Sequence, residues 1–208
     1  MRRPAASATS LATIRAAAAR CRDCPLWKNA TQTVFGEGDD TARVMLVGEQ
    51  PGDQEDRSGK PFVGPAGRLL DKALAAAGIA RESVYVTNAV KHFKFEPRGK
   101  RRIHKKPNEA EIAACHQWYE RELAALRPAL IVALGATAAR AVFGRATAIE
   151  KNRGRIMEGQ LDAAVLVTVH PSFLLRVPDE NKVGAYDRFV ADLKLATKYV
   201  ARPKRQVS

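Results

Sequence analysis

The sequence predicts a three-layer α/β/α protein in which a central, mostly parallel sheet of four strands lies between two layers of helices. Two observations predict this fold class. Four short apolar runs, rich in β-branched residues or leucine and bounded by turn residues, are typical of buried strands. Segments with helical spacing of apolar residues separate these runs, and such alternation predicts a parallel sheet covered on both faces. The length of 208 residues suits a single domain spanning residues 1–208.

The expected elements follow one another along the whole chain. The four strand candidates are Val44–Val47, Val84–Val86, Leu130–Leu134 and Val165–Val169. The expected helices are Leu11–Arg20, Gly67–Ala77, Asn108–Leu126, Ala136–Phe143 and Val183–Val200. Gly78 and Gly144 are placed to end helices, and Asn108 with Glu111 forms a variant of the capping box that begins one. Residues 1–10 and 201–208 are expected to be disordered tails.

The charge of the chain favours a polyanionic partner. Lysine and arginine number 35 against 22 acidic residues, giving a net charge of +13. A field of this sign attracts nucleic acid most commonly, although a basic surface can also serve solubility alone. No apolar segment is long enough to cross a bilayer, and none follows Arg2 and Arg3 as a secretory signal requires. We therefore expect a cytoplasmic protein without a membrane partner, and by default a monomer.

Polar residues stand where three of the predicted strands end. Glu49, Asn88 and His170 each follow an apolar run. In open α/β sheets, ligands bind beyond the carboxyl ends of the strands. Asn88 could instead cap a turn, and His170 could be a simple strand-end hydrogen bonder. The three together favour a site, in which Glu49 could act as a base or stabilise a developing cation.

Two loops near these residues could contact nucleic acid. Phe62 lies in a rigid loop between Gly59 and Gly67, where it could stack on a base, worth ~1–3 kcal/mol, or pack under its own loop. Pro171 and Ser172 suit a helix start, where backbone N–H groups attract phosphate. One of the following leucines, Leu174 or Leu175, could fill the space left by an extruded base, or both could be core residues.

The three cysteines indicate a metal site rather than a disulfide framework. They are Cys21, Cys24 and Cys115, an odd number in a chain without a secretory signal. The Cys-x-x-Cys spacing needs further ligands from elsewhere in the chain. Composition alone leaves both a zinc ion and an iron–sulfur cluster open.

Six motifs in a fixed order resemble the family 4 uracil-DNA glycosylases. They are the N-terminal Cys-x-x-Cys, GEQPG, GKPFVGPAGRLLD, VYVTNAVK, PNEAEIAAC and HPSFLL, and they extend from about Cys21 to the last helix. The resemblance implies a uracil-DNA glycosylase-like fold and uracil-containing DNA as the partner. It also implies that Glu49 and His170 flank the glycosidic bond, that Asn88 binds the uracil edge and that Phe62 stacks on the base.

The resemblance further implies a [4Fe–4S] cluster. Its ligands would be Cys21, Cys24, Cys115 and His92, since His92 stands where the family has its remaining cysteine. His116, next to Cys115, is the alternative to His92.

Two departures from the family 4 pattern resemble the UdgX subgroup, which bonds covalently to uracil-containing DNA. Gln50 replaces the alanine of the GEAPG loop, and residues 91–106 contain eight lysines and arginines and one glutamate. The subgroup resemblance implies that His104 is the nucleophile and that Gln50 contributes to uracil binding. Further DNA contacts are assigned to Lys100, Arg101, Arg102, Ser172, Leu174 and Arg176.

Three other interpretations stay open at this point. His104 could be a solvated residue of a phosphate-binding loop. The protein could be an ordinary hydrolytic glycosylase that leaves free abasic DNA. It could also be a non-catalytic nucleic-acid-binding module with a structural zinc ion.

Overall fold

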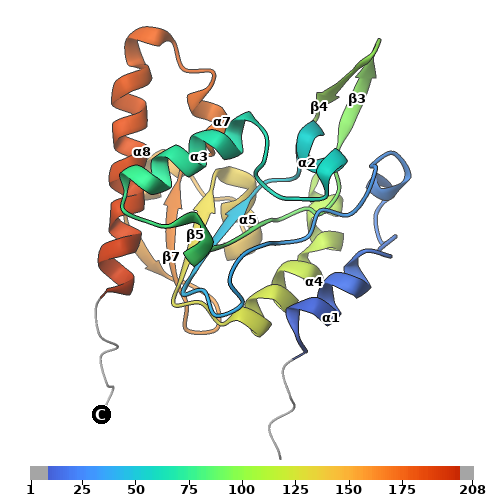
Figure 1. Cartoon of the computed structure of the whole chain (residues 1–208), viewed down its shortest axis with the longest axis horizontal. Helices are drawn as coiled ribbons and strands as arrows, with labels where there is room; N and C mark the ends of the chain where they lie inside the picture. Colours follow the sequence, from blue (N-terminus) through green and yellow to red (C-terminus); the bar gives the residue numbers. More distant parts are fainter. Residues whose placement is uncertain (1–8, 202–208) are drawn as a thin grey trace, which may run out of the picture.

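A computed structural model describes residues 9–201, which form a five-stranded sheet with helices on both faces (Figure 1). The strand order is β2-β1-β5-β7-β6. The strands are β1 (Val44–Gly48), β2 (Tyr85–Asn88), β5 (Leu130–Leu134), β6 (Ile156–Glu158) and β7 (Ala164–Thr168). The predicted α/β class and mostly parallel sheet are confirmed. The expected tails, residues 1–10 and 201–208, lie almost wholly outside the described residues.

The predicted number of strands was wrong by one. β6 pairs antiparallel with β7 at the edge of the sheet, so the sheet is mixed. β6 has three residues, of which Ile156 and Glu158 are exposed. An edge strand this short, with one buried face at most, carries no apolar run that sequence patterning could detect.

The helices are α1 (Leu11–Ala18), α2 (Asp53–Ser58), α3 (Pro65–Ala76), α4 (Glu109–Leu126), α5 (Ala136–Phe143), α6 (Ile149–Asn152), α7 (Pro171–Leu174) and α8 (Asp179–Val200), with 3-10 turns η1 (Pro25–Lys28) and η2 (Arg81–Ser83). Five of the helices correspond to predicted segments, α5 with the same bounds and the others with shifted ends, whereas the short helices α2, α6 and α7 were not among the expected ranges. The capping box of α4 is confirmed, because Asn108 and Glu111 exchange side-chain to backbone hydrogen bonds. α8 begins at Asp179 rather than at the predicted Val183. The prediction missed the first turn because that turn is polar and lacks apolar periodicity. Asp179 and Glu180 there favour a helix start electrostatically.

Alternate residues of the strands face two separate cores. On one face Leu46 and Val132 pack against α3 and α8. On the other face Met45 and Ile131 pack against α4 and α5. α1 packs on the outside of α4 and brings the N-terminal cysteines to that side of the molecule.

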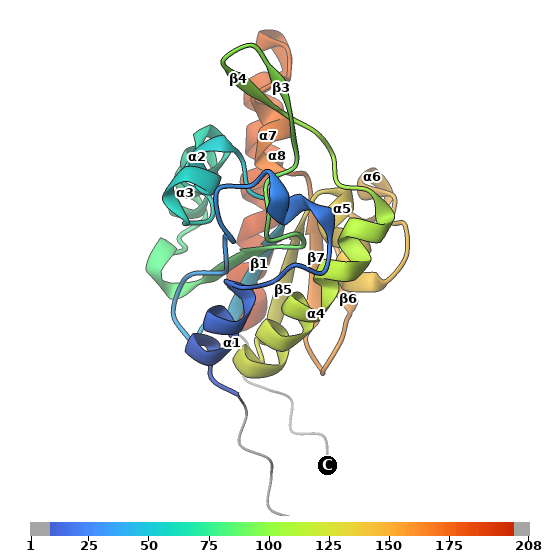
Figure 2. The same ribbon diagram turned by 90° about the vertical axis from the view of Figure 1, so that its right-hand side faces the viewer.

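A separate two-stranded hairpin projects from the body. Its strands β3 (Phe95–Arg98) and β4 (Arg101–His104) pair antiparallel and are joined by Gly99 and Lys100, with Gly99 at a φ of 58°. Figure 2 shows it standing at the same end of the molecule as α2 and α7. The sequence indicated only a basic stretch here, since Pro97 and the many charges are untypical of strands; an isolated ribbon tolerates both.

The topology places a ligand site beside β1. From β1 the chain runs to β2 on one side, and later to β5 and β7 on the other. The strand order therefore reverses at β1, and such a switch point opens a crevice beyond the carboxyl ends of the strands. None of the helices in residues 9–201 has the length and apolar character needed to span a bilayer.

Candidate active site

Glu49 directly follows β1, at the carboxyl end of the strand where the strand order reverses. The Oγ1 hydroxyl of Thr137 donates a hydrogen bond of 2.5 Å to Glu49 Oε2. The other carboxylate oxygen, Oε1, is 3.4 Å from Nε2 of His104 at the end of β4. Thr137 belongs to the first turn of α5, whose N-terminal dipole favours a negative charge. The carboxylate is thus fixed between a helix start and the hairpin, with one oxygen turned to the histidine.

Sequence reasoning missed Thr137, and its hydroxyl offers a test of this arrangement. Thr137→Val keeps the shape of the side chain but removes the bond that orients Glu49. We expect the chemistry that depends on Glu49 and His104 to slow by roughly tenfold, because losing one hydrogen bond to a charged group costs about 1.5–3 kcal/mol. Thr137→Ser, which keeps a hydroxyl, is expected to retain most of the rate. Equal single-turnover rates for the valine and serine variants would contradict this role.

His170 follows β7 and presents a defined tautomer. Its Nδ1 accepts a hydrogen bond from the backbone N–H of Ser172 at 3.2 Å, with Ser172 Oγ at 2.8 Å. Because a backbone N–H can only donate, the neutral ring carries its proton on Nε2. Burial, together with the charges of His104 and Arg176, lowers the pKa of His170 to about 4. Near neutral pH this residue is therefore an uncharged hydrogen-bond donor.

The lowered pKa of His170 predicts a loss of stability in acid. In the unfolded chain the imidazole titrates near 6.5, so between pH 6.5 and about 4 the unfolded state binds more protons than the folded state. The free energy of unfolding should fall as the pH drops through this window. The loss should be on the order of 1–3 kcal/mol and should be reduced in His170→Gln. Urea unfolding of both proteins at pH 7 and pH 4.5 measures it, and parallel losses would contradict the assignment.

Phe62 and Asn88 form a crowded corner next to His170. Phe62 has a φ of 57°, a left-handed conformation that is strained for a bulky residue, and its ring centroid is 6.1 Å from that of His170. A Cβ on Gly48 would collide with Asn88 Oδ1 and Phe62 Cζ, and one on Gly67 would collide with the Phe62 backbone. The two glycines therefore permit the close approach, and strain held in this way is typical of binding sites.

Gln50 holds the base of the hairpin rather than opening into the crevice. Its Nε2 donates to the carbonyl oxygens of Lys105, at 2.9 Å, and Lys94, at 3.2 Å. Its Oε1 accepts from the backbone N–H of Lys94 at 3.1 Å. One buried amide thus bonds both sides of the ribbon immediately before β3 and after β4. The assignment of Gln50 to uracil binding is corrected accordingly, because its amide is engaged with the protein backbone.

Arg102 fastens the hairpin to α2. Its guanidinium forms ion pairs with Asp53 and with Asp56, the latter at 2.6 Å, and is only 16% exposed. It also lies over the rings of Phe93 and Phe95, at 5.4 and 5.0 Å from their centroids. The expected DNA contact of Arg102 is therefore wrong in this structure. The neighbouring Arg101 and Lys100 are exposed and remain free to meet a phosphate backbone.

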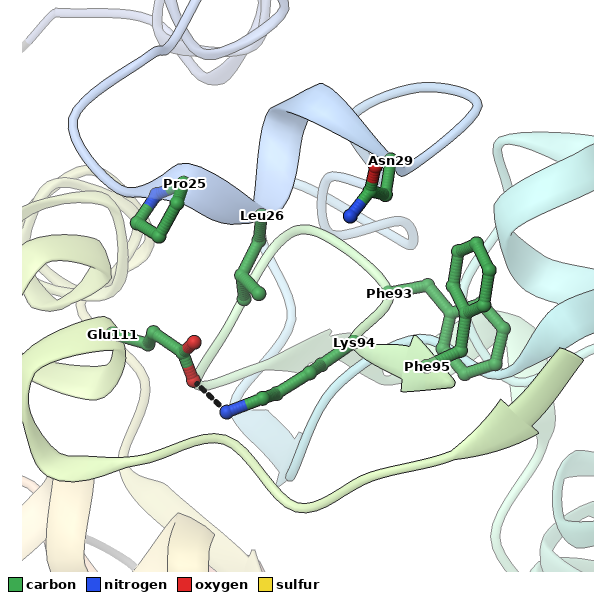
Figure 3. A pocket seen from close by; sticks show the side chains of 7 residues that line it. All are labelled: Pro25, Leu26, Asn29, Phe93, Lys94, Phe95 and Glu111. Carbon is green, nitrogen blue, oxygen red and sulfur yellow. Dashed lines mark hydrogen bonds and ion pairs between the residues drawn. The ribbon is translucent and has the colours of Figure 1, made fainter. Parts of the chain in front are cut away.

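A hollow of about 230 Å³ lies between the base of the hairpin, η1 and the start of α4 (Figure 3). Phe93, Phe95 and Leu26 line it, and Lys94 bonds Glu111 across it at 2.9 Å. Neither Glu49 nor His170 lines it. The ion pair adds a second attachment of the hairpin base, this time to the start of α4.

The residues around α7 that are exposed are not all those to which the sequence assigned DNA contacts. Leu174 is 3% exposed in the core and cannot contact DNA from there, which corrects its assignment. Leu175 and Phe173 are the exposed apolar side chains, at 45% and 44%. Ser172 is bonded to His170 rather than free for phosphate, and Arg176 is exposed.

The cysteines meet in one buried cluster between α1 and α4. Cys24 and Cys115 are buried, Cys21 packs beside them, and none forms a disulfide. Burial is the main cause that raises the pKa of Cys115 to about 12, with the neighbouring sulfurs adding to it. Within residues 9–201 no three metal-binding side chains surround a common point. The sulfurs nevertheless provide soft donors in a water-excluding setting, as a thiolate-bound metal centre requires.

His92 and His116 differ in their capacity to act as a fourth ligand. Nε2 of His92 lies 3.0 Å from Thr33 Oγ1, while its buried Nδ1 has no hydrogen-bond partner. Burial lowers the pKa of His92, which favours the neutral form that binds metals. His116 instead places Nε2 3.3 Å from the carboxylate of Glu120. The orphaned nitrogen makes His92 the donor that fits the cysteine cluster in chemistry.

Comparison with known proteins matches the region that contains the crevice. A family model described as the uracil DNA glycosylase superfamily matches residues 35–194, which is more than half of the chain. The chain belongs to the uracil-DNA glycosylase superfamily. It is 42% identical to a type-4 uracil-DNA glycosylase of Thermotoga maritima over 185 residues, covering 88% of this chain and 91% of the relative. It is 38% identical to a type-4 uracil-DNA glycosylase of Archaeoglobus fulgidus over 165 residues, covering 76% and 79%.

A more distant relative lies in another branch of the superfamily. A type-5 uracil-DNA glycosylase of Pyrobaculum aerophilum is 34% identical over 153 residues, covering 65% of this chain and 63% of the relative. In the present chain, the region matched by the family model, residues 35–194, includes Glu49, Asn88, His104 and His170. Cys21 and Cys24 precede it.

Proposed function

We propose that this protein excises uracil from DNA and captures the resulting deoxyribose covalently on His104. One observation carries the proposal beyond superfamily membership. The imidazole of His104 is held 3.4 Å from the carboxylate of Glu49 by a hairpin that Gln50 and Arg102 fasten in place. A nucleophile fixed beside the reacting centre outcompetes water through its high effective concentration.

Uracil recognition falls to the corner formed by Phe62 and Asn88. The amide of Asn88 offers a carbonyl oxygen to accept from the N3–H of uracil and an N–H to donate to its O4. Cytosine presents the opposite pattern at these two positions, so the amide selects uracil. The ring of Phe62, fixed by its strained backbone, provides a stacking surface for the base.

Bond cleavage uses opposite charges on the two sides of the glycosidic bond. When the N1–C1′ bond breaks, its electron pair leaves with the base, which becomes an anion, and the sugar becomes an oxocarbenium ion. The Nε2–H of His170 donates to the oxygen of uracil that gains charge. The carboxylate of Glu49, held by Thr137, stabilises the cationic sugar.

Capture then follows at C1′. The ring nitrogen of His104 that is free of Glu49 attacks C1′ with its lone pair, which forms a carbon–nitrogen bond and an imidazolium. The proton on the other ring nitrogen, the one near Glu49, passes to that carboxylate and finally to the uracil anion. The products are neutral uracil and a neutral imidazole adduct. A neutral imidazole is a poor leaving group, so the adduct persists.

DNA contacts come from exposed side chains on both sides of the crevice. Lys100 and Arg101 lie at the tip of the hairpin, and Arg176 lies after α7. These cations can neutralise phosphates and give salt-dependent affinity. Leu175, exposed at the C-terminal end of α7, is the residue suited to fill the space left by the extruded uracil.

The cysteine cluster holds a [4Fe–4S] centre in this proposal, with Cys21, Cys24, Cys115 and His92 as its ligands. Such a centre, when bound, supplies a rigid cross-link and a potential electron carrier. The chain itself connects it to the crevice, because the backbone N–H of Lys91 donates to Cys115 Sγ at 3.2 Å.

The ligand assignment predicts iron contents that separate the two histidines. Cys115→Ser and His92→Ala are expected to lower the iron content of the purified protein and its thermal stability. His116→Ala is expected to retain iron, because that imidazole is engaged with Glu120. Iron and acid-labile sulfide assays measure this directly. Loss of iron in His116→Ala with full iron in His92→Ala would show that His116 is the ligand. Zinc in place of iron in the parent protein would contradict the proposed cluster.

The proposed reaction is tested on a denaturing gel. The protein is incubated with a labelled oligonucleotide that contains one uracil, and in parallel with the same oligonucleotide carrying thymine. A uracil-dependent band that survives boiling in detergent is expected. Free abasic DNA without such a band would indicate an ordinary hydrolytic glycosylase, in which water takes the place of His104. No reaction of either kind would contradict the glycosylase activity itself.

A further inference from the structure

Lys91 and Glu122 form an ion pair inside the protein that the proposed chemistry does not use. Lys91 Nζ lies 2.5 Å from Glu122 Oε2, and the two side chains are 1% and 0% exposed. Removing two charges from water is costly, and well-packed apolar residues often replace such pairs without loss of stability. Stability alone is therefore a poor explanation for the pair.

The ammonium group of Lys91 is saturated, and one of its acceptors belongs to Asn88. A lysine has three N–H donors. Those of Lys91 serve Glu122 Oε2, the hydroxyl of Thr87 at 2.6 Å and the backbone carbonyl of Asn88 at 2.8 Å. Thr87 and Asn88 are the last two residues of β2, so the ammonium group is hydrogen-bonded to the end of this strand.

Glu122 in turn connects Lys91 to other parts of the protein. Its Oε1 accepts hydrogen bonds from the hydroxyls of Tyr85 and Thr87 and from the backbone N–H of Gly36. Burial and the charge of Glu122 raise the pKa of Tyr85, so its hydroxyl remains a donor. The carboxylate, which comes from α4, is thereby bonded at both oxygens and cannot swing away from Lys91.

The main chain after Asn88 joins three parts of the site. The N–H of Val90 donates to the carbonyl of Glu49 at 3.0 Å, and the N–H of Ala89 to that of Gly48 at 2.9 Å. The N–H of Lys91 donates to Cys115 Sγ at 3.2 Å. The turn that begins at Asn88 is thus bonded to the loop of Glu49 on one side and to the cysteine cluster on the other.

We propose that the Lys91–Glu122 pair is a positioning device for Asn88, which fixes the backbone of this residue so that its amide meets the edge of uracil. The inference rests on the proposed function, in which Asn88 recognises the base. The Asn88 side chain lies in the corner with Phe62 and Gly48, where little room remains for an alternative placement. A displacement of about 1 Å at such a position can reduce a rate by about 10²-fold.

The test variant removes both charges together. Lys91→Met with Glu122→Gln keeps the volume of both side chains and leaves no unpaired buried charge, which would follow from either change alone. We expect this double variant to need a roughly tenfold higher concentration of uracil-containing DNA for half-maximal adduct formation. Its affinity for the same DNA with thymine should be unchanged. Arg153→Met with Asp192→Asn is the matched control, since it removes an ion pair with side chains 11% and 10% exposed elsewhere and should keep the parental value.

Coupling to Asn88 separates positioning from general damage. Asn88→Ala should slow adduct formation in the parent protein, but it should add little once Lys91 and Glu122 have been replaced. Two substitutions that act independently have additive effects on the activation free energy, so their effects on the rate multiply. Two that act through the same residue do not. Multiplied effects, or an unchanged half-maximal concentration, would overturn the proposal.

Two further measurements keep the outcomes distinct. If the double variant does not fold, Thr87→Val removes one acceptor of Lys91 Nζ without breaking the ion pair, and it should show a smaller shift with the same non-additivity. The parent protein is assayed alongside every variant. If the parent neither captures uracil-containing DNA nor releases uracil, the proposed function has failed and the role of Asn88 fails with it. If the parent reacts and the variants behave additively, only the positioning role is overturned.

Discussion

His104→Ala is expected to abolish the covalent adduct while uracil release continues. The alanine removes the only nucleophile in the proposed capture step, but it leaves Glu49, Thr137 and His170 in place. The oxocarbenium ion should then react with water that enters the space of the imidazole, and free abasic DNA should result. We expect no detectable adduct on a denaturing gel and uracil release within about tenfold of the parent rate, since general stabilisation of both charges is retained.

The control for this prediction lies one residue away. Ile103 precedes His104 on β4, and successive side chains of a strand point to opposite faces. Ile103→Ala should therefore perturb the hairpin without removing a reacting group, and it should form the adduct. Adduct formation by His104→Ala at the parental rate would show that another side chain is the nucleophile.

Arg102→Ala is expected to destabilise the protein and to slow capture. It leaves the carboxylate of Asp56, which is fully buried, without its cation. Breaking a buried ion pair typically costs ~3–5 kcal/mol. We expect about 2–3 kcal/mol because the backbone N–H of Thr31 still donates a bifurcated hydrogen bond to both carboxylate oxygens of Asp56. The hairpin also loses its attachment to α2, so His104 should be held less firmly and adduct formation should slow by roughly tenfold or more.

Arg101→Ala provides a matched comparison. It removes the same charge from the adjacent position, but the side chain is exposed and has no carboxylate partner in the described structure. We expect the free energy of unfolding to change by no more than about 0.5 kcal/mol. DNA binding should weaken slightly, by an amount that depends on the salt concentration, because the lost contact is to phosphate. Urea unfolding and single-turnover adduct assays distinguish the two variants. Equal losses of stability in both would show that the contacts to Asp53 and Asp56 do not hold the hairpin.

The parts of the fold predictable from sequence are those with strong periodic patterns. The buried parallel strands and α4 with its Asn108 cap carry local signals that the structure follows. β3 and β4 do not, because most of their residues are exposed and the few partly buried ones form no apolar alternation, and because Pro97 argues against a strand. The DNA contact assigned to Arg102 also could not be checked from sequence. Arg102 lies in a basic stretch, and the sequence does not show that the fold brings the carboxylates of Asp53 and Asp56 to it.

The candidate site shows the same division between local and long-range information. Glu49, Asn88 and His170 could be placed together because parallel strands end at a common edge. The role of Gln50 could not, since its partners Lys94 and Lys105 are distant in sequence and offer only backbone atoms. Thr137 likewise gives no sequence signal, because a threonine at a helix start is common. Leu174 and Leu175 are adjacent leucines, and only the packing of α7 decides which is buried.

The most direct test of covalent capture is to locate the modified residue by mass spectrometry. The protein is reacted with a short uracil-containing oligonucleotide, the DNA is digested to the attached deoxyribose phosphate, and the protein is cleaved with trypsin. We predict that the added mass lies on the peptide of residues 103–105 and that fragmentation assigns it to the imidazole of His104. The modification on any other residue, or unmodified protein beside fully abasic DNA, would contradict capture by His104.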